Sequence, residues 1–214
     1  MHCIVTAGPT YEPIDQVRRL TNHSTGQLGT GLAKRLADDG HKVTLLCGTL
    51  ATHTEQPVGV ELQLFTTSAD LAEKLERLAK ADAIFHAAAV SDFAAGQVFR
   101  RTDEGKLEPL NQGKLGTRDG DLLLELKPTP KIIASLREWF AEALLLGWKY
   151  EVDGDLDSAL GQAQTHIVQN QTNACVVNGP SYGDGSGWPP GQVQAEHLPD
   201  QTALFDNLAS LAYG

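Results

Sequence analysis

The feature of this sequence that most restricts its fold is a repeated alternation of short apolar runs with longer amphipathic segments. Six runs have the length of β-strands, at residues 3–7, 42–47, 61–65, 83–88, 144–148 and 174–177, and most of them are nearly all apolar. Strands of this composition are buried on both faces, as in parallel sheets. The segments between them must therefore supply the helices that cover the sheet.

Helical segments are expected at residues 29–38, 69–80, 130–140, 156–169 and 201–212. Leu71, Leu75 and Leu78 show the spacing of a buried helix face, and Pro130 suits a first helical turn. The sequence predicts an α/β fold with a mainly parallel central sheet and helices on both faces. At 214 residues the chain suits one domain, residues 1–214.

Two segments interrupt this alternation. Residues 91–119 are polar and glycine-containing, and they are too long for an ordinary connection, so we interpret them as a flap over a site. Residues 179–191 are dense in Gly, Pro and Ser, which predicts an irregular surface loop.

Composition excludes several classes of function. A formal net charge of -10 argues against a broad nucleic-acid surface, and no apolar stretch approaches the roughly 20 residues of a membrane helix. Cys3, Cys47 and Cys175 lie in apolar runs without a CxxC pair, and no targeting pattern opens the chain. We expect buried thiols, no metal-ligating residues and a cytoplasmic location.

The first candidate site follows the first strand. Gly8 ends that strand, and Ser24, Gly26 and Gly29 lead into the first long helix. Glycines there let backbone N–H groups approach phosphate oxygens at the positive end of the helix dipole, and Ser or Thr can cap the helix. The alternative is that these glycines serve only a tight turn and close helix–sheet packing.

Further candidates lie at or near the ends of later strands. Ala88 and Ala89 leave space beside Asp92, which suits a substrate but also suits a turn or helix cap. Trp148 can stack on a base and Asn178 can bind a polar group, although core packing and a turn explain them equally well.

Two lysines are candidates for stabilising developing charge. Lys114 lies in the expected flap and Lys127 precedes the helix at residues 130–140. A mobile ammonium can close over an anionic intermediate, but most surface lysines have no such role.

Five segments together resemble the phosphopantothenate-cysteine ligase family. They are Thr6-Ala7-Gly8-Pro9-Thr10, Val17-Arg18, Thr21-Asn22-His23-Ser24-Thr25-Gly26, Ala88-Ala89-Val90-Ser91-Asp92 and Lys127-Pro128-Thr129-Pro130-Lys131-Ile132-Ile133. The resemblance runs from Ile4 to about Asn178 and implies a modified Rossmann-like three-layer fold. It implies a ligase of coenzyme A biosynthesis that joins 4′-phosphopantothenate to L-cysteine through an acyl-nucleotide, releasing pyrophosphate and CMP or AMP.

The resemblance also implies roles for single residues. The nucleotide would lie against Gly8, Ser24, Gly26, Gly29, Trp148 and Asn178. Asn22, Ala88, Ala89 and Asp92 would hold phosphopantothenate, and Arg18 would reach the site of a partner subunit. Asn22 would be catalytic through the acyl-nucleotide, and Lys114 through the second step.

The implied co-substrate is CTP or ATP, bound with Mg²⁺, and the implied assembly is a homodimer. Relatives with two activities carry an amino-terminal flavin decarboxylase domain, whereas this chain resembles the stand-alone form, so we expect no flavin. Two other hypotheses stay open: a non-catalytic nucleotide-binding module related to the ligase, and a short-chain dehydrogenase-like NAD(P) protein, which would lack its usual Tyr-x-x-x-Lys motif and early GxGxxG.

Overall fold

The computed structural model describes residues 1–53, 55–78, 80–116, 118, 120–189 and 197–212. Its core is an eight-stranded sheet in the order β13-β12-β11-β10-β6-β1-β4-β5. The strands are β1 His2–Ala7, β4 Lys42–Gly48, β5 Val60–Phe65, β6 Ala83–His86, β10 Leu144–Tyr150, β11 Ala174–Asn178, β12 Ser186–Gly187 and β13 His197–Leu198. The six from β1 to β11 pair in parallel, and β12 and β13 are antiparallel additions.

The parallel strands follow the order of dinucleotide-binding folds. Numbered along the chain, they lie as 3-2-1-4-5-6, so the strand order reverses between β1 and β6. Ligands of such sheets bind outside the carboxyl ends of the strands near this reversal. The fold class predicted from the sequence is confirmed.

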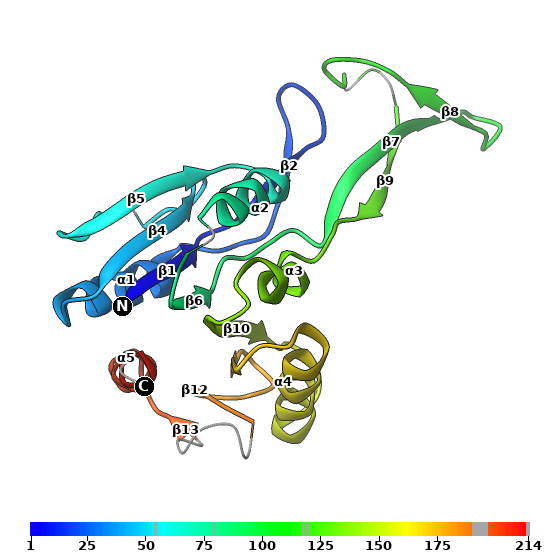
Figure 1. Ribbon diagram of the computed structural model, residues 1–214. Coiled ribbons are helices and arrows are strands. Elements are labelled where there is room, and N and C mark those ends of the chain that lie inside the picture. The colour runs from blue at the N-terminus through cyan, green and yellow to red at the C-terminus, as the bar shows by residue number, and fades with distance from the viewer. Residues whose placement is uncertain (54, 79, 117, 119, 190–196, 213–214) are drawn as a thin grey trace.

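Helices cover both faces of the sheet, and together they form three layers (Figure 1). On one face, α1 Gln27–Asp38 and α5 Gln201–Leu211 bury Leu32, Leu36 and Leu208. On the other, α2 Ser68–Arg77 and α3 Ile132–Trp139 share a second core, and α4 Leu156–Asn170 packs on β11 and β10. Among the described residues no helix is long and apolar enough to cross a membrane.

The segment interpreted as a flap has regular structure. An antiparallel sheet of β7 Phe93–Arg101, β8 Leu107–Leu110 and β9 Leu122–Pro128 projects from the body of the domain (Figure 1). The alternation of apolar and polar residues did not indicate these strands, because β7 contains a bulge between Ala95 and Val98 and Pro109 lies on the edge strand β8. Residues 117 and 119 of this segment lie outside the described residues.

The predicted surface loop at residues 179–191 is wrong in its middle. Ser186 and Gly187 form β12, and the Trp188 side chain is only 1% exposed in the main core. Burial of the large Trp188 ring removes much apolar area from water, and this stabilisation exceeds the preference of the surrounding Gly, Pro and Ser for an irregular loop. Residues 190 and 191 lie outside the described residues.

A short hairpin, β2 Tyr11–Pro13 and β3 Arg19–Thr21, leaves the end of β1 before α1 begins. Its turn points toward the projecting sheet, and the Gln16 backbone N–H donates to Gly113 O at 3.0 Å. The hairpin therefore connects the projecting sheet to the carboxyl end of β1.

Candidate functional site

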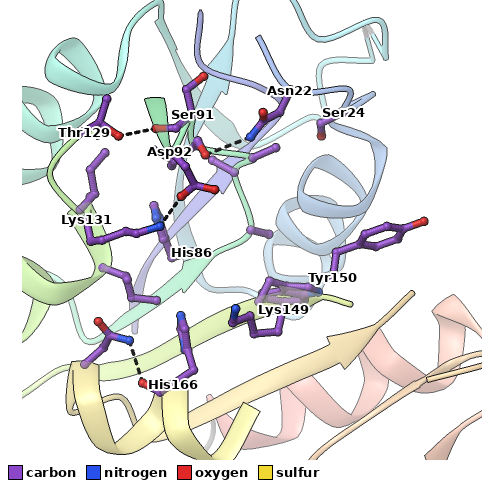
Figure 2. Close-up of a pocket in the computed structure, with 18 of the residues that line it drawn as sticks. Asn22, Ser24, His86, Ser91, Asp92, Thr129, Lys131, Lys149, Tyr150 and His166 are labelled. Atoms are coloured by element: carbon purple, nitrogen blue, oxygen red, sulfur yellow. Dashed lines mark hydrogen bonds and ion pairs between the residues drawn. The ribbon is translucent and has the colours of Figure 1, made fainter. Parts of the chain in front are cut away.

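A cavity of about 580 Å³ opens at the carboxyl ends of β6, β10 and β11 (Figure 2). Seven of the residues singled out in the sequence line it: Asn22, Ser24, Ala88, Ala89, Asp92, Trp148 and Asn178. They come from four separate stretches of the chain, and the parallel sheet brings these stretches to one edge.

The loop after β6 is fixed by hydrogen bonds to the loop after β1. Ala89 donates to Gly8 O at 3.0 Å and accepts from Thr10 N at 3.2 Å. Ser91 N donates to Thr10 Oγ1 at 2.8 Å. The small side chains of Ala88 and Ala89 then leave room for a ligand next to a fixed backbone.

Asn22 is oriented by this same loop. Its Nδ2 donates to Val90 O at 3.0 Å, as Figure 2 shows. An amide held through one N–H keeps its second N–H and its Oδ1 available to a ligand. Ser24 lines the same side of the cavity.

Asp92 forms an ion pair with Lys131, the residue that precedes α3 (Figure 2). Both side chains are more than half exposed, so the pair can separate at little cost. Among the described residues the Asp92 carboxylate caps no helix, which removes one of the two alternatives to a substrate role.

The glycines of the first turn serve different purposes. Gly8 and Gly26 have φ of 74° and 81°, which favour glycine, and Gly26 is the N-cap of α1. Among the described residues no side chain caps α1; the Thr25 hydroxyl accepts only from Gln27 N at 3.3 Å. A Cβ on Gly29 would lie 2.6 Å from Ala7 Cβ, which supports the packing explanation for this position. All three glycines lie outside the cavity lining.

Trp148 and Asn178 lie on neighbouring strands, as expected. Both are half-buried and line the cavity, and the Trp148 indole Nε1 is enclosed without a partner among the described residues. An enclosed indole N–H beside a cavity is suited to donate a hydrogen bond to a bound ligand or water.

Arg18 and Lys114 lie apart from this cavity. Arg18 Nη2 donates to Leu115 O at 3.0 Å, and Asp15 Oδ2 accepts from Leu115 N at 3.1 Å. Backbone N–H donation, chiefly from Leu115, lowers the pKa of Asp15. The hairpin turn and the loop carrying Lys114 thus form one unit, and Arg18 lines a second cavity of about 420 Å³. Within one chain, therefore, Arg18 and Lys114 do not line the cavity that contains Asn22 and Asp92.

The sequence reasoning missed several basic residues of the main cavity. His86, Lys131, Lys149 and His166 all line it. Lys131 lies within one of the segments that carry the resemblance, His86 lies in the predicted strand at residues 83–88, and Lys149 directly follows Trp148. His166 belongs to a polar stripe of α4 at residues 162, 165, 166 and 169, whose helical spacing is the signal for a face turned toward a polar ligand.

Burial sets the pKa values of His86 and His166. Burial lowers the pKa of His166, with Lys149 and Lys131 adding to the effect. Burial, and then His166, lowers the pKa of His86 to about 4. Both rings are therefore neutral near pH 7, and the permanent positive charges of the cavity are the two lysines.

Among the described residues, no three His, Cys, Asp or Glu side chains converge as a metal site. A Mg²⁺ ion that accompanies a nucleotide can be held largely by phosphate oxygens and water, with one or two carboxylates. Asp92 is the carboxylate of this cavity that fits such a role.

The strand order and the cavity define a Rossmann-like α/β domain with a cavity for a small ligand at the carboxyl edge of its sheet. Residues 1–188 match the family described as the DNA/pantothenate metabolism flavoprotein C-terminal domain. The chain belongs to this family.

Curated relatives include two proteins named coenzyme A biosynthesis bifunctional protein CoaBC. That of Bacillus subtilis is 36% identical over 152 residues, covering 70% of this chain and 34% of the relative. That of Thermococcus kodakarensis is 32% identical over 180 residues, covering 82% of this chain and 40% of the relative. The chain thus spans well under half the length of these relatives.

Solved structures agree on the fold. The DNA/pantothenate metabolism flavoprotein from Streptococcus pneumoniae superposes with a TM-score of 0.83 at 27% identity, covering 100% of both chains. The C-terminal domain of a coenzyme A biosynthesis bifunctional protein CoaBC gives 0.76 at 21% identity, covering 99% of this chain and 93% of that one.

Proposed function

We propose that the protein is a phosphopantothenate-cysteine ligase acting in coenzyme A biosynthesis. The observation that carries the proposal is the convergence of Asn22, Ala88, Ala89 and Asp92 with Trp148 and Asn178 on one cavity. Family membership and the CoaBC relatives support it. So does a fold shared, at a TM-score of 0.69, with a Cab2 variant whose structure is a complex with phosphopantothenate-cysteine.

In the first half-reaction, a carboxylate oxygen of 4′-phosphopantothenate attacks the α-phosphorus of CTP or ATP. The bond from that phosphorus to the pyrophosphate oxygen breaks, which releases pyrophosphate and leaves an acyl-nucleotide. Lys131 and Lys149 are placed to offset the negative charge of the phosphates. Mg²⁺ bound with the triphosphate would neutralise more of this charge and orient the leaving group.

In the second half-reaction, the amine of L-cysteine attacks the acyl carbon. The bond from that carbon to the nucleotide oxygen breaks, the nucleoside monophosphate leaves, and the amine gives up a proton. The side chain of Asn22, already oriented by Val90 O, can donate to the acyl oxygen as charge develops on it. Lys114 would act in this step only after the projecting sheet approaches a cavity.

A homodimer would supply the residues that one chain leaves apart. Arg18 borders the second cavity beside apolar residues of the projecting sheet, Val98, Leu122 and Leu124. A partner subunit packing there would bring Arg18 to the partner's main cavity. Sedimentation velocity of the protein and of Leu124→Asp tests this assembly: a monomer at micromolar concentration would contradict it.

The function is tested by pyrophosphate release from the protein with 4′-phosphopantothenate and Mg²⁺. Separate reactions contain CTP or ATP, each with and without cysteine. Cysteine-dependent turnover with one nucleotide establishes the ligase and its base preference. Pyrophosphate without phosphopantothenoylcysteine indicates that the second step is lost, and silence in all four reactions favours a binding module.

A further inference from the structure

His86 is the last residue of β6, at the centre of the sheet. It lies between β1, where its register partner is Thr6, and β10. The side chain is only 7% exposed, yet it lines the main cavity (Figure 2). A buried imidazole in such a position has one side fixed by the protein and one side toward a ligand.

The fixed side is Nδ1, which lies 3.0 Å from Thr6 Oγ1. The same Thr6 oxygen accepts from Ala88 N, also at 3.0 Å. The Thr6 oxygen has a second lone pair that can accept from an Nδ1–H, but the buried Thr6 hydroxyl hydrogen would then have no acceptor among the described residues. Nδ1 as the acceptor satisfies this hydroxyl completely. An imidazole that accepts at Nδ1 carries its proton on Nε2.

The charges around the ring favour this neutral tautomer. His166, Lys131 and Lys149 line the same cavity, and Asp92, the carboxylate of its lining, is engaged by Lys131. Burial together with the neighbouring His166 keeps the pKa of His86 low, at about 4. The ring is therefore an uncharged donor at neutral pH, and Nε2 has no protein partner among the described residues.

The position of His86 indicates which part of a ligand it meets. Trp148 and Asn178, on the nucleotide side, belong to β10 and β11. Asn22 and Asp92, on the phosphopantothenate side, follow β3 and β6. His86 lies between the two groups, where the carboxylate and the α-phosphate have to meet.

We propose that His86 is a further residue of the reaction, donating its Nε2–H to an oxygen at the junction between the acyl group and the nucleotide phosphate. This inference rests on the proposed function. A neutral donor stabilises negative charge there without needing a proton from solution, and it cannot form an ion pair with Asp92 in place of the ligand.

The tautomer can be measured independently of turnover, by long-range ¹H–¹⁵N correlation spectra of the full chain. We expect a pyridine-type Nδ1 and a pyrrole-type Nε2 at pH 6.5, with the Nε2 resonance moving when CTP and 4′-phosphopantothenate are added with Mg²⁺. An Nδ1–H tautomer, an imidazolium at this pH, or an Nε2 resonance unaffected by the substrates would overturn the inference.

Kinetics give the second test. His86→Leu removes the donor and should lower kcat of the pyrophosphate-releasing step by roughly 10- to 100-fold, as expected for a hydrogen bond to a charged group. His86→Gln keeps a neutral donor and should recover much of the loss, with little change in KM. His53→Leu, outside the cavity lining, is the matched control.

Equal activity of His86→Leu and the unaltered protein would refute the role of His86 while leaving the ligase intact. Absence of pyrophosphate release from the unaltered protein would refute the ligase instead. In that case, the spectra still decide whether His86 is a neutral donor toward these ligands.

Discussion

Gly29 separates the packing explanation of the first turn from phosphate binding. It lies in the first turns of α1, directly against β1. A Cβ added there would lie 2.6 Å from Ala7 Cβ and 2.9 Å from Thr6 O. Relaxed carbon contacts are about 3.5–4.0 Å, so the overlap is roughly 1 Å. Neither neighbour is the end of a flexible side chain, so the helix itself has to move.

The expected cost of Gly29→Ala follows from two opposing terms. Overpacking of a filled core costs about 1–3 kcal/mol. The higher helix propensity of Ala returns up to about 1 kcal/mol. We therefore expect a net destabilisation of up to about 2 kcal/mol. Gly161→Ala is the matched control, because Gly161 lies within α4 with no atom within 4 Å of the added Cβ, and it should be stabilising by up to about 1 kcal/mol.

Thermal unfolding of both variants by circular dichroism measures the difference. The propensity gain is common to both variants, so they should differ by the overpacking cost of about 1–3 kcal/mol. For a domain of this size, 1 kcal/mol shifts Tm by about 2–4 °C, so the difference should be roughly 2–12 °C. Nucleotide affinity of folded Gly29→Ala should stay close to that of the unaltered protein. If Gly29→Ala is stabilised as much as Gly161→Ala, α1 does not approach β1 this closely and the packing explanation is wrong.

Four other substitutions test the site. Asn22→Ala should lower turnover by about 100- to 1,000-fold, as loss of an oxyanion donor does, measured by pyrophosphate release and product formation; normal turnover would contradict its assignment. Lys114→Ala should slow product formation from cysteine while pyrophosphate release continues, and equal slowing of both would contradict its place in the second step. Lys131→Ala should weaken CTP or ATP binding in calorimetry but change unfolding free energy by less than about 1 kcal/mol, because its pair with Asp92 is exposed. His86→Gln should flatten the pH dependence of stability. In the unaltered protein the folded pKa of His86 is about 4, below the unfolded value of 6.5, so the contribution of His86 to the free energy of unfolding is complete above pH 6.5. This contribution falls by roughly 3 kcal/mol toward pH 4, because the unfolded chain takes up the proton first. Urea unfolding at pH 7 and 4.5 checks this, and parallel losses in the two proteins would refute it.

The central sheet was predictable because most of its parallel strands are apolar on both faces. Each of the six predicted runs is a parallel strand, with ends shifted by no more than a few residues. The projecting sheet was not predictable in the same way. β8 and β9 are largely exposed, so no core imposes an apolar alternation on them.

Site residues were predictable where the end of a strand alone determines their position, and not where side-chain packing determines it. Ala88, Ala89 and Asp92 follow a strand, and the carboxyl end of a central strand is where such sheets bind ligands. His166 depends on the rotation of α4 about its axis relative to β10. That rotation is set by packing: the His166 ring occupies the space left by Gly147, where an added Cβ would lie 2.6 Å from His166 Cε1. Helical spacing alone indicates a polar face but not what that face meets.

The formal net charge of the chain does not indicate the charge of its main cavity. The chain carries a formal charge of -10, yet its main cavity contains Lys131 and Lys149. Charges farther than about 8 Å are largely screened at physiological ionic strength. Within that range each lysine already has a carboxylate partner: Asp92 for Lys131, and Glu151, at 3.2 Å, for Lys149. An anionic ligand must therefore compete with a carboxylate at each lysine or share the ammonium with it, which makes its affinity depend on these local contacts and not on the sum of charges.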